Sequence, residues 1–93
     1  MIDIRNVIFF LKEKFKNFDL KVDEFKPDEL VYIYINYYND SKFELCFEIT
    51  RKWIGFSKLD KSIEIDFSSN DEIFEKFTNF KSFIEEFVIK SSK

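Results

Sequence analysis

The chain has 93 residues, carries a formal net charge of -3 and is 45% hydrophobic, with 14 Phe, 4 Tyr and 1 Trp. A chain of this length buries only roughly 60 to 65% of the surface that it exposes when unfolded, so a second core is excluded and residues 1–93 are expected to form a single domain. His is absent, and Cys and Gly occur once each. This composition excludes a His-activated nucleophile, a zinc site of thiolate and imidazole ligands, and a glycine-rich phosphate loop.

The compartment is predicted from the thiol content and from the N-terminal residues. Cys46 is the only cysteine, so no intrachain disulfide exists and a reducing environment is indicated. Residues 1–5 carry an acid where a secretory signal carries bases, and no apolar run reaches the roughly 18 residues that span a bilayer. We therefore expect a cytoplasmic protein that makes no membrane contact. We assign no role to Cys46, because a cysteine within a strand is typically a small packed side chain.

The first half of the chain predicts a helix followed by strands. Asp3 is expected to cap a helix that ends near Asn17 and whose apolar residues recur at helical steps, namely Ile4, Ile8, Leu11 and Phe15. Alternation over residues 18–25 predicts a half-buried strand, and the only Pro, in residues 26–29, predicts a turn. Residues 30–38 are almost wholly β-branched or aromatic and predict the strongest strand of the chain.

The second half predicts the rest of the sheet and a closing helix. Residues 39–41 are expected to turn into a strand over 43–49, which completes a hairpin. A strand over 53–57 is allowed, although Gly55 permits a bulge, a bend or a tight turn, and residues 63–67 alternate as a last strand. Ser69 and Glu72 have the spacing of a capping box, and Asp71 suits the positive end of a helix dipole. The helix that should follow carries an apolar face of Ile73, Phe77, Phe80, Ile84 and Phe87.

The fold class predicted from this order is α+β, a two-layer sandwich with an N-terminal helix, a four- to five-stranded antiparallel sheet and a C-terminal helix. On the strand over 30–38, the side chains expected to face the helices are Val31, Ile33, Ile35 and Tyr37. The side chains expected on the opposite face are Tyr32, Tyr34, Asn36 and Tyr38. If one helix covered each face instead, this second set would be buried; the amphipathic pattern of residues 43–49 argues against that arrangement.

The tyrosine-bearing side of this strand is the first candidate binding surface. It should lie beside Glu44 and Glu48 of the paired strand, which brings hydroxyls and carboxylates together on an open sheet. Tyr is favoured at protein interfaces because it offers a large rigid area with a polar tip at a small entropic cost. The alternative is that the tyrosines only stabilise the hairpin through cross-strand packing.

An acidic segment is the second candidate binding surface, because residues 19–40 contain six acids and two bases. The acids are Asp19, Asp23, Glu24, Asp28, Glu29 and Asp40. A negative rim beside an aromatic patch suits a basic partner surface, such as the phosphate-binding groove of a nuclease. The alternative is that these acids are ordinary solvated charges. No basic stripe is evident, so direct binding to nucleic acid is not expected.

Catalysis is not expected from this sequence. Adjacent carboxylates such as Asp23 and Glu24, or Glu85 and Glu86, point apart on a strand or helix and cannot share a substrate. An enzyme would have to use carboxylates, Lys and Tyr alone. We therefore expect no catalytic residue, no cofactor and no bound metal, although a concave pocket lined by convergent polar groups would favour a ligand-binding or enzymatic domain.

The layout of a short acidic chain with a helix, an antiparallel sheet and a closing helix resembles small phage anti-CRISPR inhibitors and bacterial toxin-immunity proteins. The resemblance covers the whole chain as architecture and transfers no residue. It implies a stoichiometric protein inhibitor that blocks or mimics nucleic acid on a target enzyme. Our leading hypothesis is a non-catalytic acidic inhibitor of a basic, nucleic-acid-processing enzyme. One alternative is an immunity protein that neutralises a nuclease toxin. The other is a structural or homo-oligomerisation module that forms a homodimer.

Overall fold

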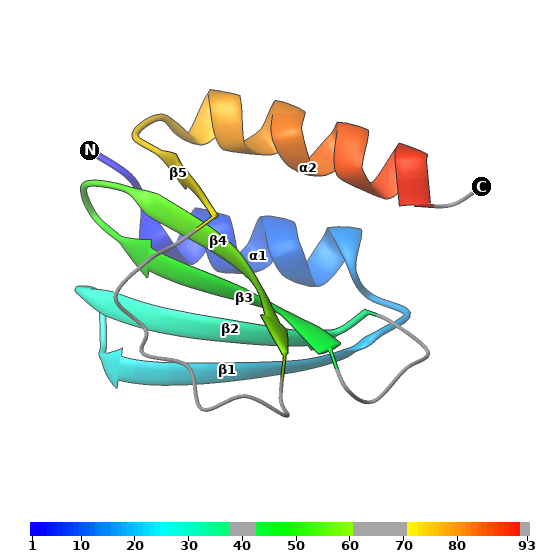
Figure 1. Cartoon of the computed structure of the whole chain (residues 1–93). Helices are drawn as coiled ribbons and strands as arrows, with labels where there is room; N and C mark the ends of the chain where they lie inside the picture. Colours follow the sequence, from blue (N-terminus) through cyan, green and yellow to red (C-terminus); the bar gives the residue numbers. More distant parts are fainter. Residues whose placement is uncertain (38–42, 61–70, 92–93) are drawn as a thin grey trace.

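The computed structural model describes residues 1–37, 43–60 and 71–91 of the chain, and these form two helices and a five-stranded sheet (Figure 1). In chain order the elements are α1 (Ile4–Lys14), β1 (Asp19–Lys26), β2 (Leu30–Asn36), β3 (Phe43–Thr50), β4 (Ile54–Asp60), β5 (Glu72–Phe74) and α2 (Phe77–Ser91). All four pairings are antiparallel, and the order in the sheet, β1-β2-β3-β4-β5, follows the chain. Both helices lie on the same face of the sheet, so the predicted α+β sandwich is confirmed.

The core lies between that face of the sheet and the two helices. Alternate residues of the two central strands are fully buried there, as the pattern predicts: Val31, Ile33 and Ile35 of β2, and Leu45, Phe47 and Ile49 of β3. The ring of Phe47 is at the centre, with centroids 5.3 Å from Phe56, 5.8 Å from Phe80 and 6.3 Å from Phe15. Full burial of one such side chain stabilises the fold by about 1.5 to 3 kcal/mol. Phe47 therefore joins the sheet to both ends of the chain.

The first helix begins where the sequence predicts. The carboxylate of Asp3 accepts hydrogen bonds from the backbone N–H groups of Arg5 (3.0 Å) and Asn6 (3.4 Å), which caps the helix. The helix ends at Lys14, earlier than the predicted end near Asn17. Within the described residues, neither α1 nor α2 is both long enough and apolar enough to cross a lipid bilayer.

The helices contact each other through aromatic rings and one exposed ion pair. Phe10 of α1 meets Phe77 and Phe80 of α2 edge to face, with centroids 5.7 and 6.1 Å apart. Lys14 Nζ lies 3.6 Å from the carboxylate of Glu85, and both side chains are substantially exposed. Because exposed ion pairs contribute little, the aromatic contacts hold the two helices together.

The first hairpin has a strained turn and a bulge. Glu29 N–H donates to the Lys26 carbonyl (2.9 Å), and Asp28 adopts a φ of 65°. Asp tolerates this left-handed region better than most residues other than glycine. The register of β1 against β2 is regular from Asp19 to Asp23 and then shifts before Lys26. The regular part of β1 is therefore only its first five residues.

The start of the second helix differs from the prediction. Glu72 is not part of a capping box: it begins β5, which pairs with β4 so that Phe74 lies opposite Ile54. The Asp71 carboxylate accepts from the Lys58 N–H (3.0 Å) instead of meeting a helix dipole. The edge of β4 offers both donors and acceptors, and this pairing outweighs the local capping pattern.

The apolar face of α2 is consequently shorter than predicted. Ile73 lies in β5 and is 58% exposed, so it does not belong to the helical face. The remaining predicted residues do face the core: Phe80 and Ile84 are buried, and Phe77 and Phe87 pack against them. Three other predictions, the turn over 39–41, the strand over 63–67 and the capping role of Ser69, lie outside the described residues.

Candidate functional site

The open face of the sheet, opposite the two helices, gathers most of the residues that the sequence singled out. We define this open face by the residues of β1 to β4 whose side chains alternate away from the core. They are Asp19, Lys21, Asp23, Lys26, Leu30, Tyr32, Tyr34, Asn36, Glu44, Cys46, Glu48, Thr50, Gly55, Ser57 and Leu59. Tyr37 lies on the helix side with its ring centroid 5.7 Å from that of Phe15, as predicted. The arrangement with one helix on each face is therefore wrong.

Tyr32 occupies the middle of one cross-strand row. It lies between Asp23 of β1 and Glu48 of β3, and its ring stacks on that of Tyr34 with centroids 6.5 Å apart and an interplanar angle of 22°. Partial burial raises the pKa of Tyr32 to about 12, assisted by a hydrogen bond to the Glu48 carboxylate and by its negative charge. The hydroxyl therefore remains a neutral donor at physiological pH.

Tyr34 occupies the middle of the neighbouring row, between Lys21 of β1 and Cys46 of β3. Burial raises the pKa of Tyr34 above its usual value, and the surrounding acidic groups, beginning with Cys46 and Asp23, raise it further. Both tyrosines are half-buried, so each presents an edge and a hydroxyl on the open face while the rest of its ring packs on the sheet. This geometry is compatible with hairpin stabilisation and with partner binding alike.

Cys46 lies between Tyr34 and Ser57 in the same row and is 5% exposed. Burial raises the pKa of its thiol to about 12, and the carboxylates of Glu44 and Glu48 act in the same direction. A neutral, buried thiol is neither a nucleophile nor a soft metal ligand at physiological pH. Among the described residues, no three Cys or acidic side chains come close enough together to hold a metal ion.

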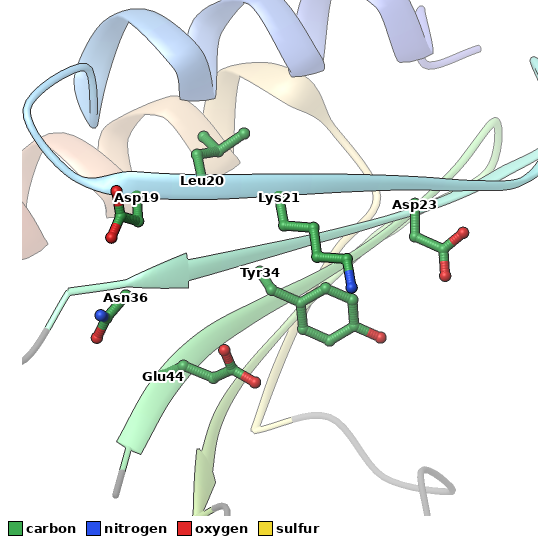
Figure 2. Close-up of a pocket in the computed structure, with 7 residues that line it drawn as sticks. All are labelled: Asp19, Leu20, Lys21, Asp23, Tyr34, Asn36 and Glu44. Atoms are coloured by element: carbon green, nitrogen blue, oxygen red, sulfur yellow. The ribbon is translucent and has the colours of Figure 1, made fainter. Parts of the chain in front are cut away.

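A shallow depression of about 520 Å³ lies where the open face meets the β1 edge (Figure 2). Its lining residues are Asp19, Leu20, Lys21, Asp23, Tyr34, Asn36 and Glu44. Three of these are carboxylates and one is an ammonium group, so the depression is negative. Figure 2 shows the polar side chains directed to the open face, whereas Leu20 points toward the helices.

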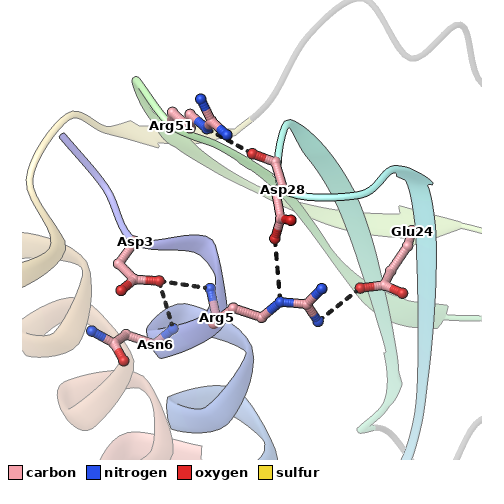
Figure 3. A network of polar contacts seen from close by, with 6 residues as sticks. All are labelled: Asp3, Arg5, Asn6, Glu24, Asp28 and Arg51. Carbon is pink, nitrogen blue, oxygen red and sulfur yellow. Dashed lines mark hydrogen bonds and ion pairs between the residues drawn. The ribbon is translucent and has the colours of Figure 1, made fainter.

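The predicted acidic rim is divided in the structure. Asp23 belongs to the open face, but Glu24 and Asp28 are turned toward Arg5 of α1, with contacts of 3.0 and 3.3 Å (Figure 3). Arg51 adds a hydrogen bond from Nε to the Asp28 carbonyl, at 2.7 Å. These contacts attach the β1–β2 turn to the helix and to the β3–β4 turn.

The remaining residues of the two predicted binding surfaces are not among those that define the open face. Glu29 is exposed in the β1–β2 turn, while Tyr38 and Asp40 lie outside the described residues. Sequence reasoning missed Lys21 and Lys26, the two bases among the open-face residues defined above. The signal was present, because Lys21 alternates with Leu20 and Val22 in phase with Asp19 and Asp23.

The described part of the chain is thus an α+β domain with an acidic, tyrosine-bearing open sheet face. No family model matches the chain, and no curated protein or solved structure has significant similarity to it.

Proposed function

We propose that this protein is a non-catalytic acidic inhibitor whose open face binds the basic groove of a nucleic-acid-processing enzyme. The observation that carries the proposal is the charge of that face. Four carboxylates surround the two stacked tyrosines, whereas the bases among the described residues of the face are two, Lys21 and, at the far end of β1, Lys26. The carboxylates are those of Asp19, Asp23, Glu44 and Glu48. Such a face is complementary to a surface that has evolved to hold phosphates.

The tyrosines supply rigid aromatic contact area, which charged groups alone do not. A purely electrostatic contact gives fast association but limited affinity, whereas rigid aromatic area gives contacts that persist after encounter. Tyr32 and Tyr34 are already stacked on each other and held by the sheet, so binding costs little side-chain entropy. Both hydroxyls are neutral at the centre of the negative face: that of Tyr34 can donate or accept a hydrogen bond, and that of Tyr32, which donates to Glu48, can still accept one.

The depression at the β1 edge supports a protein partner rather than a small-molecule substrate. Small-molecule sites are usually enclosed and mostly apolar, with few polar groups. Here the depression is open, and polar side chains dominate its lining. Its three carboxylates, beside Asn36 and the Tyr34 hydroxyl, suit the guanidinium or ammonium end of an Arg or Lys that projects from a partner.

The test compares the chain with a variant whose depression has reversed charge. Immobilised wild type and Asp23→Lys/Glu44→Lys are incubated with host lysate, and the captured nucleic-acid-processing enzymes are purified and assayed. We expect the wild type to inhibit a captured enzyme, the inhibition to weaken with salt and with excess nucleic acid, and the variant to lose it.

The matched control is Glu13→Lys/Glu86→Lys, which makes the same change in net charge at two exposed helical positions. This control should retain capture and inhibition. Equal loss in both double variants would show that only total charge matters, and failure to capture any basic nucleic-acid-processing enzyme would contradict the proposal. The identity of the captured enzyme separates an anti-CRISPR-type inhibitor from an immunity protein that neutralises a nuclease toxin.

A further inference from the structure

The edge of the sheet at β1 differs from the edge at β5. β5 has three residues, whereas β1 has eight. Within the described part of the chain, residues 19–23 make no backbone hydrogen bond outside the ladder with β2. A long edge of this kind presents a row of unpaired N–H and C=O groups that can accept another strand.

The side chains of β1 specify what that strand must carry. On the open face the edge reads negative, positive, negative, at Asp19, Lys21 and Asp23, while Leu20 and Val22 lie on the helix side. Neither Asp19 nor Lys21 forms an ion pair with any described residue. An incoming strand must therefore offer alternating charges of the opposite order on one face and apolar side chains on the other.

We propose that this strand is β1 of a second copy of the chain, paired antiparallel about Leu20 so that the two sheets join edge to edge. In this register Asp19 of each copy lies opposite Lys21 of the other, which forms two cross-strand ion pairs. Leu20 lies opposite Leu20, and Phe18 opposite Val22, on the helix side. In this single register, opposite charges face each other on one side of the joined sheet and apolar side chains face each other on the other side.

The neighbouring registers are poorer. Pairing about Lys21 places Lys21 opposite itself and Asp19 opposite Asp23, so all facing charges are alike. Pairing about Val22 sets Lys21 opposite Asp23, but it places Leu20 opposite Glu24 and extends into the bulge that follows Asp23. The register about Leu20 uses mainly the regular part of β1 and is the one that we adopt.

A second depression, on the helix side of the same edge, lies beside the proposed centre. It has a volume of about 360 Å³ and is lined by Lys12, Phe15, Lys16, Phe18, Asp19 and Leu20. Phe18 is 39% exposed there, so the second copy would cover apolar area that the single chain leaves in contact with water. The lysines can lay their aliphatic stems over this contact and keep their ammonium groups in solvent.

The pairing does not require the function proposed above. The two proposals share Asp19 and Lys21, which line the depression and would pair in the dimer, but the pairing leaves Tyr32, Tyr34, Glu44 and Glu48 uncovered. Their tests differ, because the dimer is measured on the chain alone and inhibition on a captured enzyme, so the failure of one is distinguishable from the failure of the other. In the joined sheet, the open faces of the two copies lie side by side.

Sedimentation equilibrium over a range of protein concentrations tests the pairing. We expect the wild type to dimerise, and Lys21→Glu and Asp19→Lys each to weaken the dimer by roughly tenfold or more, because each replaces two ion pairs with two like-charge contacts. An equimolar mixture of the two variants should dimerise again, since positions 19 and 21 are then both acidic in one chain and both basic in the chain that faces it. The double swap Asp19→Lys/Lys21→Glu should also restore the dimer.

Lys52→Glu, in the turn between β3 and β4, is the charge-matched control for Lys21→Glu and should dimerise like the wild type. Circular dichroism establishes that each variant is folded. A wild type that remains monomeric at its highest soluble concentration overturns the proposal. So does a dimer that the single charge reversals leave intact, because that dimer would use another surface. A mixture of the two single variants that stays monomeric also counts against it.

Discussion

Tyr32 lies directly opposite Glu48 across the β2–β3 ladder, and the Glu48 carboxylate accepts a hydrogen bond from the tyrosine hydroxyl. Because the partial burial and the hydrogen bond both favour the protonated hydroxyl, folding raises the pKa of Tyr32 from 10.0 to about 12. The pair therefore links the stability of the sheet to alkaline pH.

The first prediction concerns this linkage. The stabilisation that the protonated Tyr32 hydroxyl gives to the folded chain is fully present below pH 10.0, where the hydroxyl is protonated in both the folded and the unfolded state. It is lost as pH rises toward about 12, because the unfolded chain releases this proton first. Tyr32→Phe should cost about 1 kcal/mol at neutral pH. It should also lose less stability than the wild type above pH 10.0. Urea unfolding followed by Trp53 fluorescence at several pH values measures both effects, and parallel pH profiles would contradict the assignment.

The second prediction concerns the thiol of Cys46. Burial raises the pKa of this thiol from 9.0 to about 12, and the thiolate fraction falls tenfold for each unit. An aromatic disulfide reagent at mildly alkaline pH should therefore react roughly a thousandfold more slowly with the folded chain than with the chain in urea. The absorbance of the released thiol follows the rate. Equal rates in the two states would place Cys46 at the surface.

The third prediction compares two phenylalanines. Phe80 is fully buried between α2 and the sheet, whereas Phe9 is 67% exposed on α1. Phe80→Ala should lower the free energy of unfolding by about 3 to 5 kcal/mol, and Phe9→Ala should change it by about 0.5 kcal/mol or less. Urea titrations give both values. If Phe80→Ala does not fold, Phe80→Leu should still be clearly less stable than Phe9→Ala.

The fourth prediction concerns the start of α1. Asp3→Ala removes the acceptor for the N–H groups of Arg5 and Asn6 and should cost about 1 kcal/mol, whereas Asp3→Ser should keep most of the stability. Thermal unfolding by circular dichroism compares the two variants. Equal losses would mean that the side chain of residue 3 does not cap the helix.

The local elements of the fold were predictable where one pattern dominates. The β2–β3 hairpin follows from strict alternation, because a shift by one residue would expose Ile33 and Phe47 and bury Glu48. Asp3 was recognisable as a cap because its hydrogen bonds reach only two and three residues along the chain. Local sequence contains all the information that such contacts need.

The errors arose where distant segments meet. The capping pattern at Glu72 gave way to pairing with β4, which depends on a strand edge formed far earlier in the chain. Glu24 and Asp28 were expected beside the tyrosines, but Arg5 draws them to the helix because the start of α1 and the β1–β2 turn are close in space. The proximity of these segments is a property of the packed layers and is not contained in the spacing of either one.

The sequential order of the strands has a consequence for the speed of folding. Each ladder joins strands that are consecutive among the described elements, so the strand pairs of the sheet can form one after another. The exception is the docking of α1 and α2, since Phe15 and Phe80 meet on Phe47 from opposite ends of the chain. That step closes the largest loops, and we expect it to be the slowest part of the reaction.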